Sequence, residues 1–336
     1  MNSKKTLLLG ASAIIVFVGL IAGFNYSVDP LCYYCKEIDV NKSSVNRYYQ
    51  VAQMIVKNPD AEQVLLGSSR GETTSPLWIQ SVSGLKTLNL SASGAEVITK
   101  KAFLNLALEK TKLKKVIWYA DYFELITSNA DAKIKNTQVL RKYAADMIAN
   151  EGFAVKLQEI QKLIDHNTTE ASFAALKHSP ASSLGQGEGS QVDYSACDQP
   201  DFKGKETPES LKNEIDLLYQ AYVNGSIKPP QNTEALKRFE ATIKDLQARN
   251  IAVLIVIPPY HPVFMKRLET EYPGIYEAHI KWIQNIQKLQ GPGIEVKNYF
   301  NGIPEDNGSP SYWNDGVHFT CKSVIQMLRK TLVGGV

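Results

Sequence analysis

The sequence has almost no excess of charge of either sign. Its 37 Lys and Arg residues face 34 Asp and Glu residues, giving a formal net charge of +3. Binding to nucleic acid needs clustered positive charge that displaces counterions from phosphates. The charge balance therefore gives no reason to expect a nucleic-acid partner. With 44% hydrophobic and 21% charged residues, the composition also excludes a disordered or fibrous chain.

Cysteine and histidine are both scarce, with four and five copies in 336 residues. Cys32 and Cys35 form a C-x-x-C motif, but Lys36 follows it where haem attachment requires His. A redox role would need a strand and helix around the motif, and Asp29-Pro30 before it predicts extended chain instead. Zinc would need a nearby pair of His ligands, which this stretch lacks. We therefore expect no metal and no cofactor.

Long uncharged stretches are rare as well, with one exception at residues 7–23 (LLLGASAIIVFVGLIAG). This run is near the lower limit for a helix that crosses the ~30 Å hydrocarbon layer. Lys4 and Lys5 precede it, so the positive-inside rule predicts a cytoplasmic tail at 1–6, an anchor at 7–24 and an exported remainder. A cleaved signal peptide is the alternative, although the run ends without an A-x-A-like site. The anchored form would be a single-pass protein of a bacterial inner membrane, with its C-terminal domain in the periplasm or extracytoplasmic space.

Export changes how the cysteines are interpreted. In an oxidising compartment an even number of cysteines favours disulfides. The simplest of the three connectivities pairs Cys32 with Cys35 and Cys197 with Cys321.

Beyond a linker at 25–45, apolar strands alternate with amphipathic helices through a domain at 46–336. Strands that are apolar throughout are covered on both faces, so the pattern predicts a doubly wound α/β fold with a mostly parallel sheet. The expected strands are 64–66, 87–90, 116–119, 252–257 and 294–296, and the expected helices are 46–57, 97–108, 233–249, 275–289 and 322–332.

A helical insertion at about 128–226 interrupts this alternation. We expect helices at 137–150, 154–163 and 208–222, with a polar, Gly/Ser-rich loop at 179–201 that contains Cys197. The insertion could act as a lid over a site or serve as a structural addition.

Ligands of such sheets bind beyond the carboxyl ends of the strands, where several polar residues fall. Ser69 follows the first strand, Asp121 the third, and Asp315 and His318 lie in a late loop. A serine hydroxyl needs an imidazole to take its proton, and the imidazole needs a carboxylate to fix its tautomer. The spacing D-x-x-H places Asp315 and His318 on one turn of the chain, where the carboxylate can reach the imidazole ring.

The strand ending in Gly67-Ser68-Ser69-Arg70, the small-residue turn with Gly94 and the late D-x-x-H together resemble the SGNH (GDSL) hydrolase superfamily. The usual first motif is G-D-S. The chain is most similar to the membrane-anchored, exported branch, which includes alginate and peptidoglycan O-acetylation proteins and the teichoic-acid D-alanylation protein. That branch tends to carry a VDP-type segment after the membrane helix, present here at residues 28–30.

The resemblance implies roles for these residues. Ser69 would be the nucleophile, His318 the general base and Asp315 its orienting partner. The backbone N–H groups of Ser69 and Gly94 would contribute to an oxyanion hole. Ser68 stands at the position of the family's Asp and would be a neighbour of the nucleophile.

Asp121 departs from the family pattern, which has an Asn donor after the third strand. An ionised carboxylate cannot donate a hydrogen bond to an oxyanion. We hypothesise that Asp121 instead forms a bidentate, charge-assisted pair with Arg70 and so orients the nucleophile turn.

Each candidate also has a structural interpretation. Ser69 could be a helix N-cap and His318 a core histidine. His261 could be a turn residue or a substrate contact, and Tyr260 and Trp313 could form a sugar-stacking wall or simply pack.

The resemblance implies acyl-ester chemistry on a cell-envelope glycan or another acylated small substrate, through an acyl group on Ser69. Transfer would involve a multi-span membrane acyl-transfer protein as partner. The alternatives are a carbohydrate or lipid esterase of the same fold, and a non-catalytic envelope scaffold or glycan-binding protein.

Overall fold

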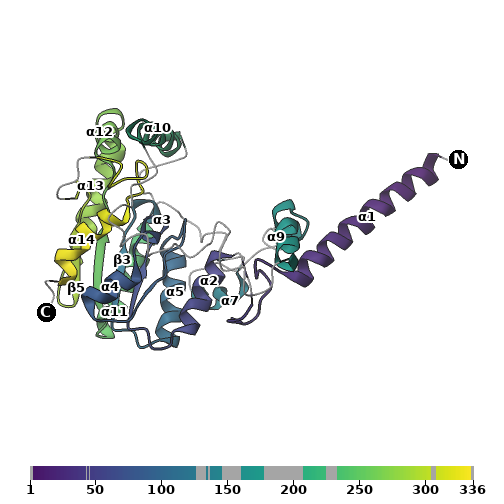
Figure 1. Ribbon diagram of the computed structural model, residues 1–336, viewed down its shortest axis with the longest axis horizontal. Coiled ribbons are helices and arrows are strands. Elements are labelled where there is room, and N and C mark those ends of the chain that lie inside the picture. The colour runs from purple at the N-terminus through teal and green to yellow at the C-terminus, as the bar shows by residue number, and fades with distance from the viewer. Residues whose placement is uncertain are drawn as a thin grey trace. The chain divides into compact units, whose positions relative to one another are not determined.

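The computed structural model describes residues 3–42, 44, 46–125, 134, 137–145, 160–177, 207–224, 233–303 and 308–333. The chain divides into two compact units. The first comprises Met1–Met54 and Ala132–Gln191, and the second comprises Ile55–Asp131 and Val192–Val336. Each unit is described by itself below (Figure 1).

A five-stranded parallel sheet forms the centre of the second unit, with the strand order β2-β1-β3-β4-β5. Every residue of β1 and β2 is buried, as is nearly all of β3 and β4, so these strands lack the alternation of a sheet with one wet face. The prediction of a doubly wound α/β fold is confirmed. The strands are β1 (Gln63–Leu66), β2 (Thr87–Asn89), β3 (Lys115–Tyr119), β4 (Ala252–Ile257) and β5 (Ile294–Asn298).

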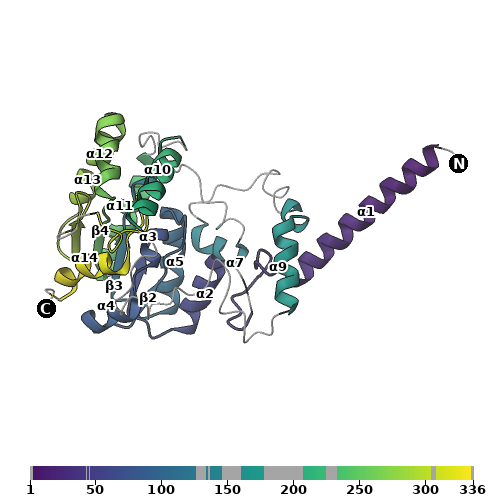
Figure 2. The ribbon, with the colours of Figure 1, turned by 45° about the horizontal axis from the view of Figure 1, so that its top comes forward.

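Helices cover both faces of this sheet. The chain runs from β1 to its neighbour β2 and then returns to the other side of β1 for β3, β4 and β5. Right-handed crossovers therefore place the helix between β1 and β2 on one face of the sheet and the helices that connect the later strands on the other face. Accordingly α4 (Pro76–Ser83) contacts α14 (Cys321–Val333), while α5 (Val97–Lys110) contacts α11 (Thr233–Ala248). Figure 2 shows these helices around the strands. The reversal places the ends of β1 and β3 side by side, which is where ligands bind in such folds.

Two helices that we did not predict begin with proline. Ser75 caps α4 by accepting from the N–H of Trp78, and Gly84 ends that helix with a φ of 70°. α12 (Pro262–Glu271) starts after His261, whose side chain accepts from the N–H of Val263. Both helices are short, and a proline start signal alone predicts a helix less strongly than the long periodic segments of the other helices do.

The remaining helices of this unit are α3 (Ser69–Glu72), η1 (Tyr122–Leu125), α10 (Pro208–Asn224) and α13 (Pro273–Gln287). α2 (Arg47–Lys57) links the two units in sequence. The predicted helix at 208–222 is confirmed by α10.

In the first unit, α1 (Ser3–Val28) is the expected apolar helix, and it extends beyond the predicted anchor at both ends. Its segment Leu9–Val28 is long and apolar enough to cross a membrane. α9 (His166–Lys177), which we did not predict, contacts it. The predicted helix at 137–150 is described to residue 145, as α7 (Gln138–Arg141) and the 3-10 turn η2 (Lys142–Ala144). Most of 154–163, the loop at 179–201 and Cys197 lie outside the described residues.

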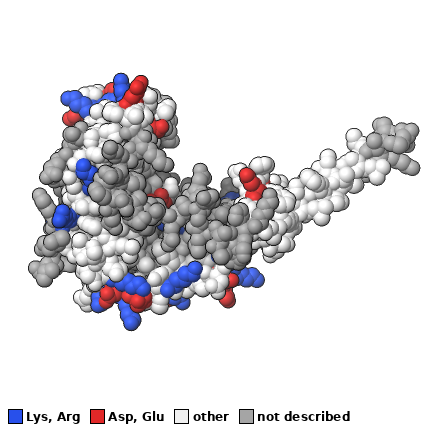
Figure 3. All heavy atoms as spheres, in the orientation of Figure 1, with Lys and Arg blue, Asp and Glu red and all other residues white. Residues whose placement is uncertain are grey.

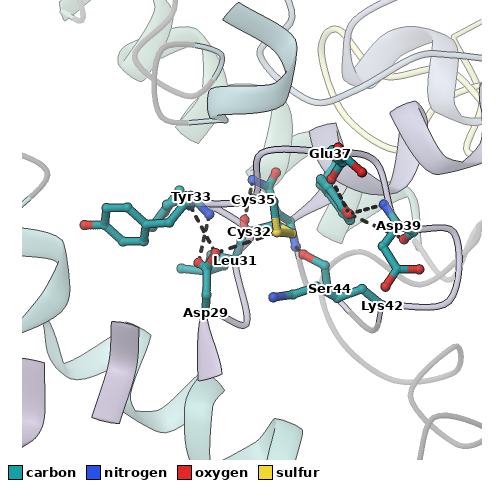
Figure 4. The surroundings of a disulfide bond; sticks show 12 residues. Asp29, Leu31, Cys32, Tyr33, Cys35, Glu37, Asp39, Lys42 and Ser44 are labelled. Carbon is teal, nitrogen blue, oxygen red and sulfur yellow. Dashed lines mark hydrogen bonds between the residues drawn. A yellow bond between two sulfur atoms is a disulfide. The ribbon is translucent and has the colours of Figure 1, made fainter. Parts of the chain in front are cut away.

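The segment that we expected to be an extended linker folds into turns closed by a Cys32–Cys35 disulfide (Figure 4). Asp29 and Cys32 adopt positive φ values of 40° and 51°, and the Asp29 carboxylate accepts from the N–H groups of Tyr33 (2.9 Å) and Tyr34 (3.0 Å). Burial raises the pKa of Asp29, although these hydrogen bonds oppose the shift. Cys321 is also disulfide-bonded, and its expected partner Cys197 lies outside the described residues.

Candidate active site

The turn at residues 67–70, which carries the predicted nucleophile Ser69 and is called the nucleophile turn below, joins β1 to α3. Ser68 is the N-cap of α3, because its hydroxyl accepts from the N–H of Arg70, so capping does not occupy Ser69. A Cβ at Gly67 would lie 2.6 Å from Ser91 Oγ, and one at Gly71 would lie 2.3 Å from it. Glycine at both positions therefore lets this turn pack directly against the end of β2.

Three side chains of the predicted triad meet at this turn. The Oγ of Ser69 lies 2.8 Å from Nε2 of His318, and Nδ1 of His318 lies 2.6 Å from Oδ2 of Asp315. An ionised carboxylate only accepts, so Nδ1 carries the hydrogen and Nε2 is left to accept from the serine hydroxyl. This is the arrangement that general-base activation of a serine requires.

Asp315 is held by its own loop. Its Oδ1 accepts from the N–H groups of Val317 (2.8 Å) and His318 (2.7 Å), while Oδ2 faces the imidazole. Burial alone would raise the pKa of Asp315, but the hydrogen bonds and the charge of His318 outweigh burial, and the pKa is lowered. Asp315 therefore stays a carboxylate and can stabilise an imidazolium. The side chain of His318 remains 32% exposed, so the base can be reached from solvent.

Two backbone N–H groups are the predicted donors of an oxyanion hole. In the described part of the chain, the N–H groups of Ser69 and Gly94 have no hydrogen-bond acceptor. Gly94 lies exposed in the loop after β2 with a φ of 73°, a conformation that glycine adopts without strain. Both groups are therefore free to donate to a developing oxyanion.

Asp121 lies at the end of β3 and pairs with Arg70, as we hypothesised, but not through a bidentate bond. Nη1 of Arg70 donates to Oδ1 of Asp121 at 3.0 Å, and the hydroxyl of Ser68 donates to Oδ2 at 2.6 Å. The second carboxylate oxygen is thus taken by a serine from the same turn. Asp121 binds both neighbours of Ser69, which fixes the turn on either side of the nucleophile.

Arg70 uses its remaining donors on two further loops. Its Nε donates to the carbonyl oxygen of Val317 at 3.0 Å, and its Nη2 donates to the carbonyl oxygen of Pro259. The guanidinium lies 4.4 Å from the centre of the Tyr260 ring. One buried cation therefore joins the nucleophile turn to the loop that carries His318 and to the ends of β3 and β4.

A second ion pair, which we did not predict, lies behind Asp121. Nζ of Lys100 on α5 donates to Glu124 and to the carbonyl oxygen of Tyr119 (2.7 Å), and lies 3.9 Å from Asp121. Arg70, Lys100, Asp121 and Glu124 are all at least 96% buried, and their formal charges cancel. Burial raises the pKa of Glu124 to about 7, against the opposing charge of Lys100. Lys100 is spaced three or four residues from the apolar Val97, Phe103 and Leu104, which was the available signal in the sequence.

Tyr260, His261 and Trp313, the other predicted site residues, pack inside the second unit. All three are buried, Trp313 completely. Nδ1 of His261 accepts from Val263, and its Nε2 lies 3.0 Å from the carbonyl oxygen of Gly308, so both ring nitrogens are engaged. These contacts agree with His261 as a turn residue and with Tyr260 and Trp313 as packing residues, and a role of the three in substrate contact stays a prediction.

Among the described residues, the group with the right donors for a metal is Asp29, Cys32 and Cys35. Its two sulfur atoms are joined in a disulfide and are not the thiolates that a metal requires.

No family model and no curated protein matches this chain. A solved structure from Streptococcus pneumonia, described as "a putative platelet activating factor", is similar with 12% sequence identity and a TM-score of 0.41. The similarity covers 86% of this chain and 94% of that one, and a TM-score this low does not indicate a shared function.

Proposed function

We propose that the protein carries out serine-dependent acyl-ester chemistry through an acyl group on Ser69. The observation that carries this proposal is the hydrogen-bonded chain from Ser69 through His318 to Asp315. Its three members come from opposite ends of the domain sequence, yet they meet in the order and tautomer that acyl transfer needs.

The chemistry follows from the geometry. Nε2 of His318 takes the hydroxyl proton as Oγ of Ser69 attacks the carbonyl carbon of an ester. The N–H groups of Ser69 and Gly94 would donate to the resulting oxyanion, an interaction typically worth about 3 kcal/mol for one donor. Collapse breaks the ester bond, His318 returns the proton to the leaving alcohol, and the acyl group remains on Ser69. An acceptor hydroxyl deprotonated by His318 then takes the acyl group and restores Ser69.

The acceptor decides whether the protein is a transferase or an esterase, and both use the same residues. The resemblance to exported O-acylation proteins favours transfer of an acetyl or similar group to or from a cell-envelope glycan. In that case α1 is an uncleaved anchor, the second unit faces the periplasm or extracytoplasmic space, and a multi-span membrane protein supplies the acyl group.

Labelling with a fluorophosphonate tests the nucleophile. The full chain in detergent is expected to react, and Ser69→Ala is expected to abolish the label. Ser81→Ala is the matched control, because Ser81 is an exposed serine on α4. A label that survives Ser69→Ala would refute the assignment of Ser69.

Acyl transfer has its own test. The protein is incubated with an aryl acetate, and an envelope oligosaccharide is then added. Transfer predicts that the oligosaccharide gains the mass of an acetyl group and that the acetyl group on Ser69 disappears faster than in water alone. Equal rates with and without the oligosaccharide would favour an esterase.

A non-catalytic envelope scaffold or glycan-binding protein is the second candidate. Asp121 favours it, because a carboxylate stands where the resemblance expects an oxyanion donor. Failure of the wild-type protein to take the label, while a control serine esterase reacts, would support this function over the first.

A further inference from the structure

The first unit carries exposed apolar side chains beside the candidate membrane helix. α9 exposes Phe173 (54%) and Leu176 (66%), one helical turn apart. Ile160 and Ile164, which precede α9, are also exposed. Water-exposed apolar side chains that gather on one face commonly mark a binding surface.

α9 is attached to α1 at the point where the apolar run ends. The side-chain amide of Asn25 donates to Oγ1 of Thr169 (2.8 Å) and to the carbonyl oxygen of Leu163 (2.7 Å). The ring of Phe24 lies 4.8 Å from that of Phe173, centre to centre. Figures 1 and 2 both show α9 beside this end of α1.

These contacts also give α9 a direction. Thr169 contacts Asn25, and Phe173, one turn later, contacts Phe24, one residue earlier in α1. The C-terminal end of α9, where Leu176 lies, therefore leads toward the apolar part of α1. Figure 3 shows no charged side chain on the visible face of the described part of α1 up to its contact with α9.

The length of α1 would place the attached end of α9 at the surface of the hydrocarbon layer. Asn25 is buried against α9, so the part of α1 available to lipid ends near Phe24. Residues 7–24 span about 27 Å at 1.5 Å per residue, slightly less than the ~30 Å hydrocarbon layer. Apolar groups next to Phe24 would then lie at the boundary between acyl chains and headgroups.

The side chains around this boundary suit a lipid interface. Tyr26 is 58% exposed, and its ring lies 5.0 Å from that of Tyr34. Nζ of Lys162 lies 4.3 Å from the centre of the Tyr33 ring. Tyrosine rings concentrate at headgroup level, and lysine reaches from there to the phosphates.

We propose that the C-terminal end of α9 is an interfacial membrane element, with Phe173 and Leu176 inserted into the outer headgroup region beside α1. Helices that lie in the interface typically bury their apolar face by about 5–10 Å. The occupant of this surface is the phospholipid bilayer that holds α1. The proposal depends on that anchor and not on the acyl chemistry of Ser69.

Quenching of an added tryptophan by brominated phospholipids tests the proposal. Full-length Leu176→Trp is reconstituted into vesicles whose lipids carry bromine either near the headgroup end or near the methyl end of the acyl chain. The signal of the wild-type protein is subtracted. We expect strong quenching of the added fluorescence, greater with bromine near the headgroup.

Two matched variants make the result decisive. Phe17→Trp, in the middle of the uncharged stretch, should be quenched best by bromine near the methyl end. Asn167→Trp, exposed in the first turn of α9, should be quenched little by either lipid. If Phe17→Trp is quenched and Leu176→Trp matches Asn167→Trp, the interfacial role of α9 is wrong. If Phe17→Trp is not quenched, α1 is not in the bilayer and the proposal fails with the anchor.

Discussion

Asp315 accepts three hydrogen bonds, and two of them come from backbone N–H groups of its own loop. The N–H groups of Val317 and His318 hold Oδ1, so Oδ2 is directed at the imidazole without further adjustment. A carboxylate fixed in this way costs little reorganisation when the imidazole becomes charged, which is how preorganised groups lower a barrier.

Asp315→Asn tests that role. The amide keeps the shape of the side chain but removes the negative charge and can present a donor to Nδ1, which favours the wrong tautomer of His318. We expect the rate of fluorophosphonate labelling to fall on the order of 10³- to 10⁴-fold. Asp245→Asn is the control, because Asp245 is an exposed carboxylate on α11. A labelling rate close to that of the control would show that Asp315 does not assist His318.

At the scale of secondary-structure elements, Arg70 joins segments that are far apart in the chain. Its guanidinium bonds to the end of β3, to the end of β4 and to the loop before His318, and its backbone belongs to the nucleophile turn. The distance between Ser69 and His318 therefore depends on one planar side chain with several donors.

Arg70→Lys is expected to keep the positive charge but lose this geometry, because an ammonium group cannot reach three diverging acceptors. A displacement of about 1 Å can cost 10²-fold in rate, so we expect a loss of that order in kcat for aryl acetate hydrolysis with little change in KM. Arg249→Lys, at an exposed position in the turn just after α11, is the control. A change confined to KM would argue for substrate binding by Arg70 instead of positioning.

Much of the fold follows from the sequence at this scale, because β1, β3 and β4 are uninterrupted apolar segments between helices. The strand-end rule then places Ser69 and Asp121 at one edge of the sheet without further information. The spacing in D-x-x-H adds the orientation of His318. These local signals place the candidate residues near one another, and the resemblance to the SGNH superfamily is what assigns their roles.

Other features depend on tertiary packing that no local pattern reveals. Lys100 lies in an amphipathic segment, where a charged residue normally faces solvent, and its burial depends on Glu124 from another element. Trp313 and His261 occur in loop-like sequence and are nevertheless buried, because their loops pack against each other. The contact between α1 and α9 joins segments about 140 residues apart.

For the molecule as a whole, two buried groups predict opposing effects of pH on stability. Burial raises the pKa of Glu124 to about 7, so stability is lost as pH rises from 4.5 through 7. Burial lowers the pKa of His279 to about 4, so stability is lost as pH falls from 6.5 through 4. The two effects oppose each other between pH 4.5 and 6.5.

Glu124→Gln should therefore expose the effect of His279. Its free energy of unfolding is expected to rise with pH between 4.5 and 6.5, by up to about 1 kcal/mol per unit, while that of the wild type stays nearly flat. Urea titrations across this range measure both slopes. Equal slopes in the two proteins would contradict the assignment to Glu124.

The disulfides give a test of the compartment. If the second unit is exported, non-reducing mass mapping of the full chain from its native host should find no free thiol, with Cys32 joined to Cys35 and Cys197 to Cys321. Four free thiols would contradict both the pairing and export. Reduction with a thiol before alkylation is the control for accessibility of the cysteines.

The separation of Ser69 from His318, 249 residues along the chain, sets when the proposed nucleophile can first be activated. If the second unit is exported, its serine would cross the membrane early and stay an ordinary alcohol until the loop at 312–320 arrived. Reactivity would then be timed to the end of translocation, and esters met earlier on the route would be left intact.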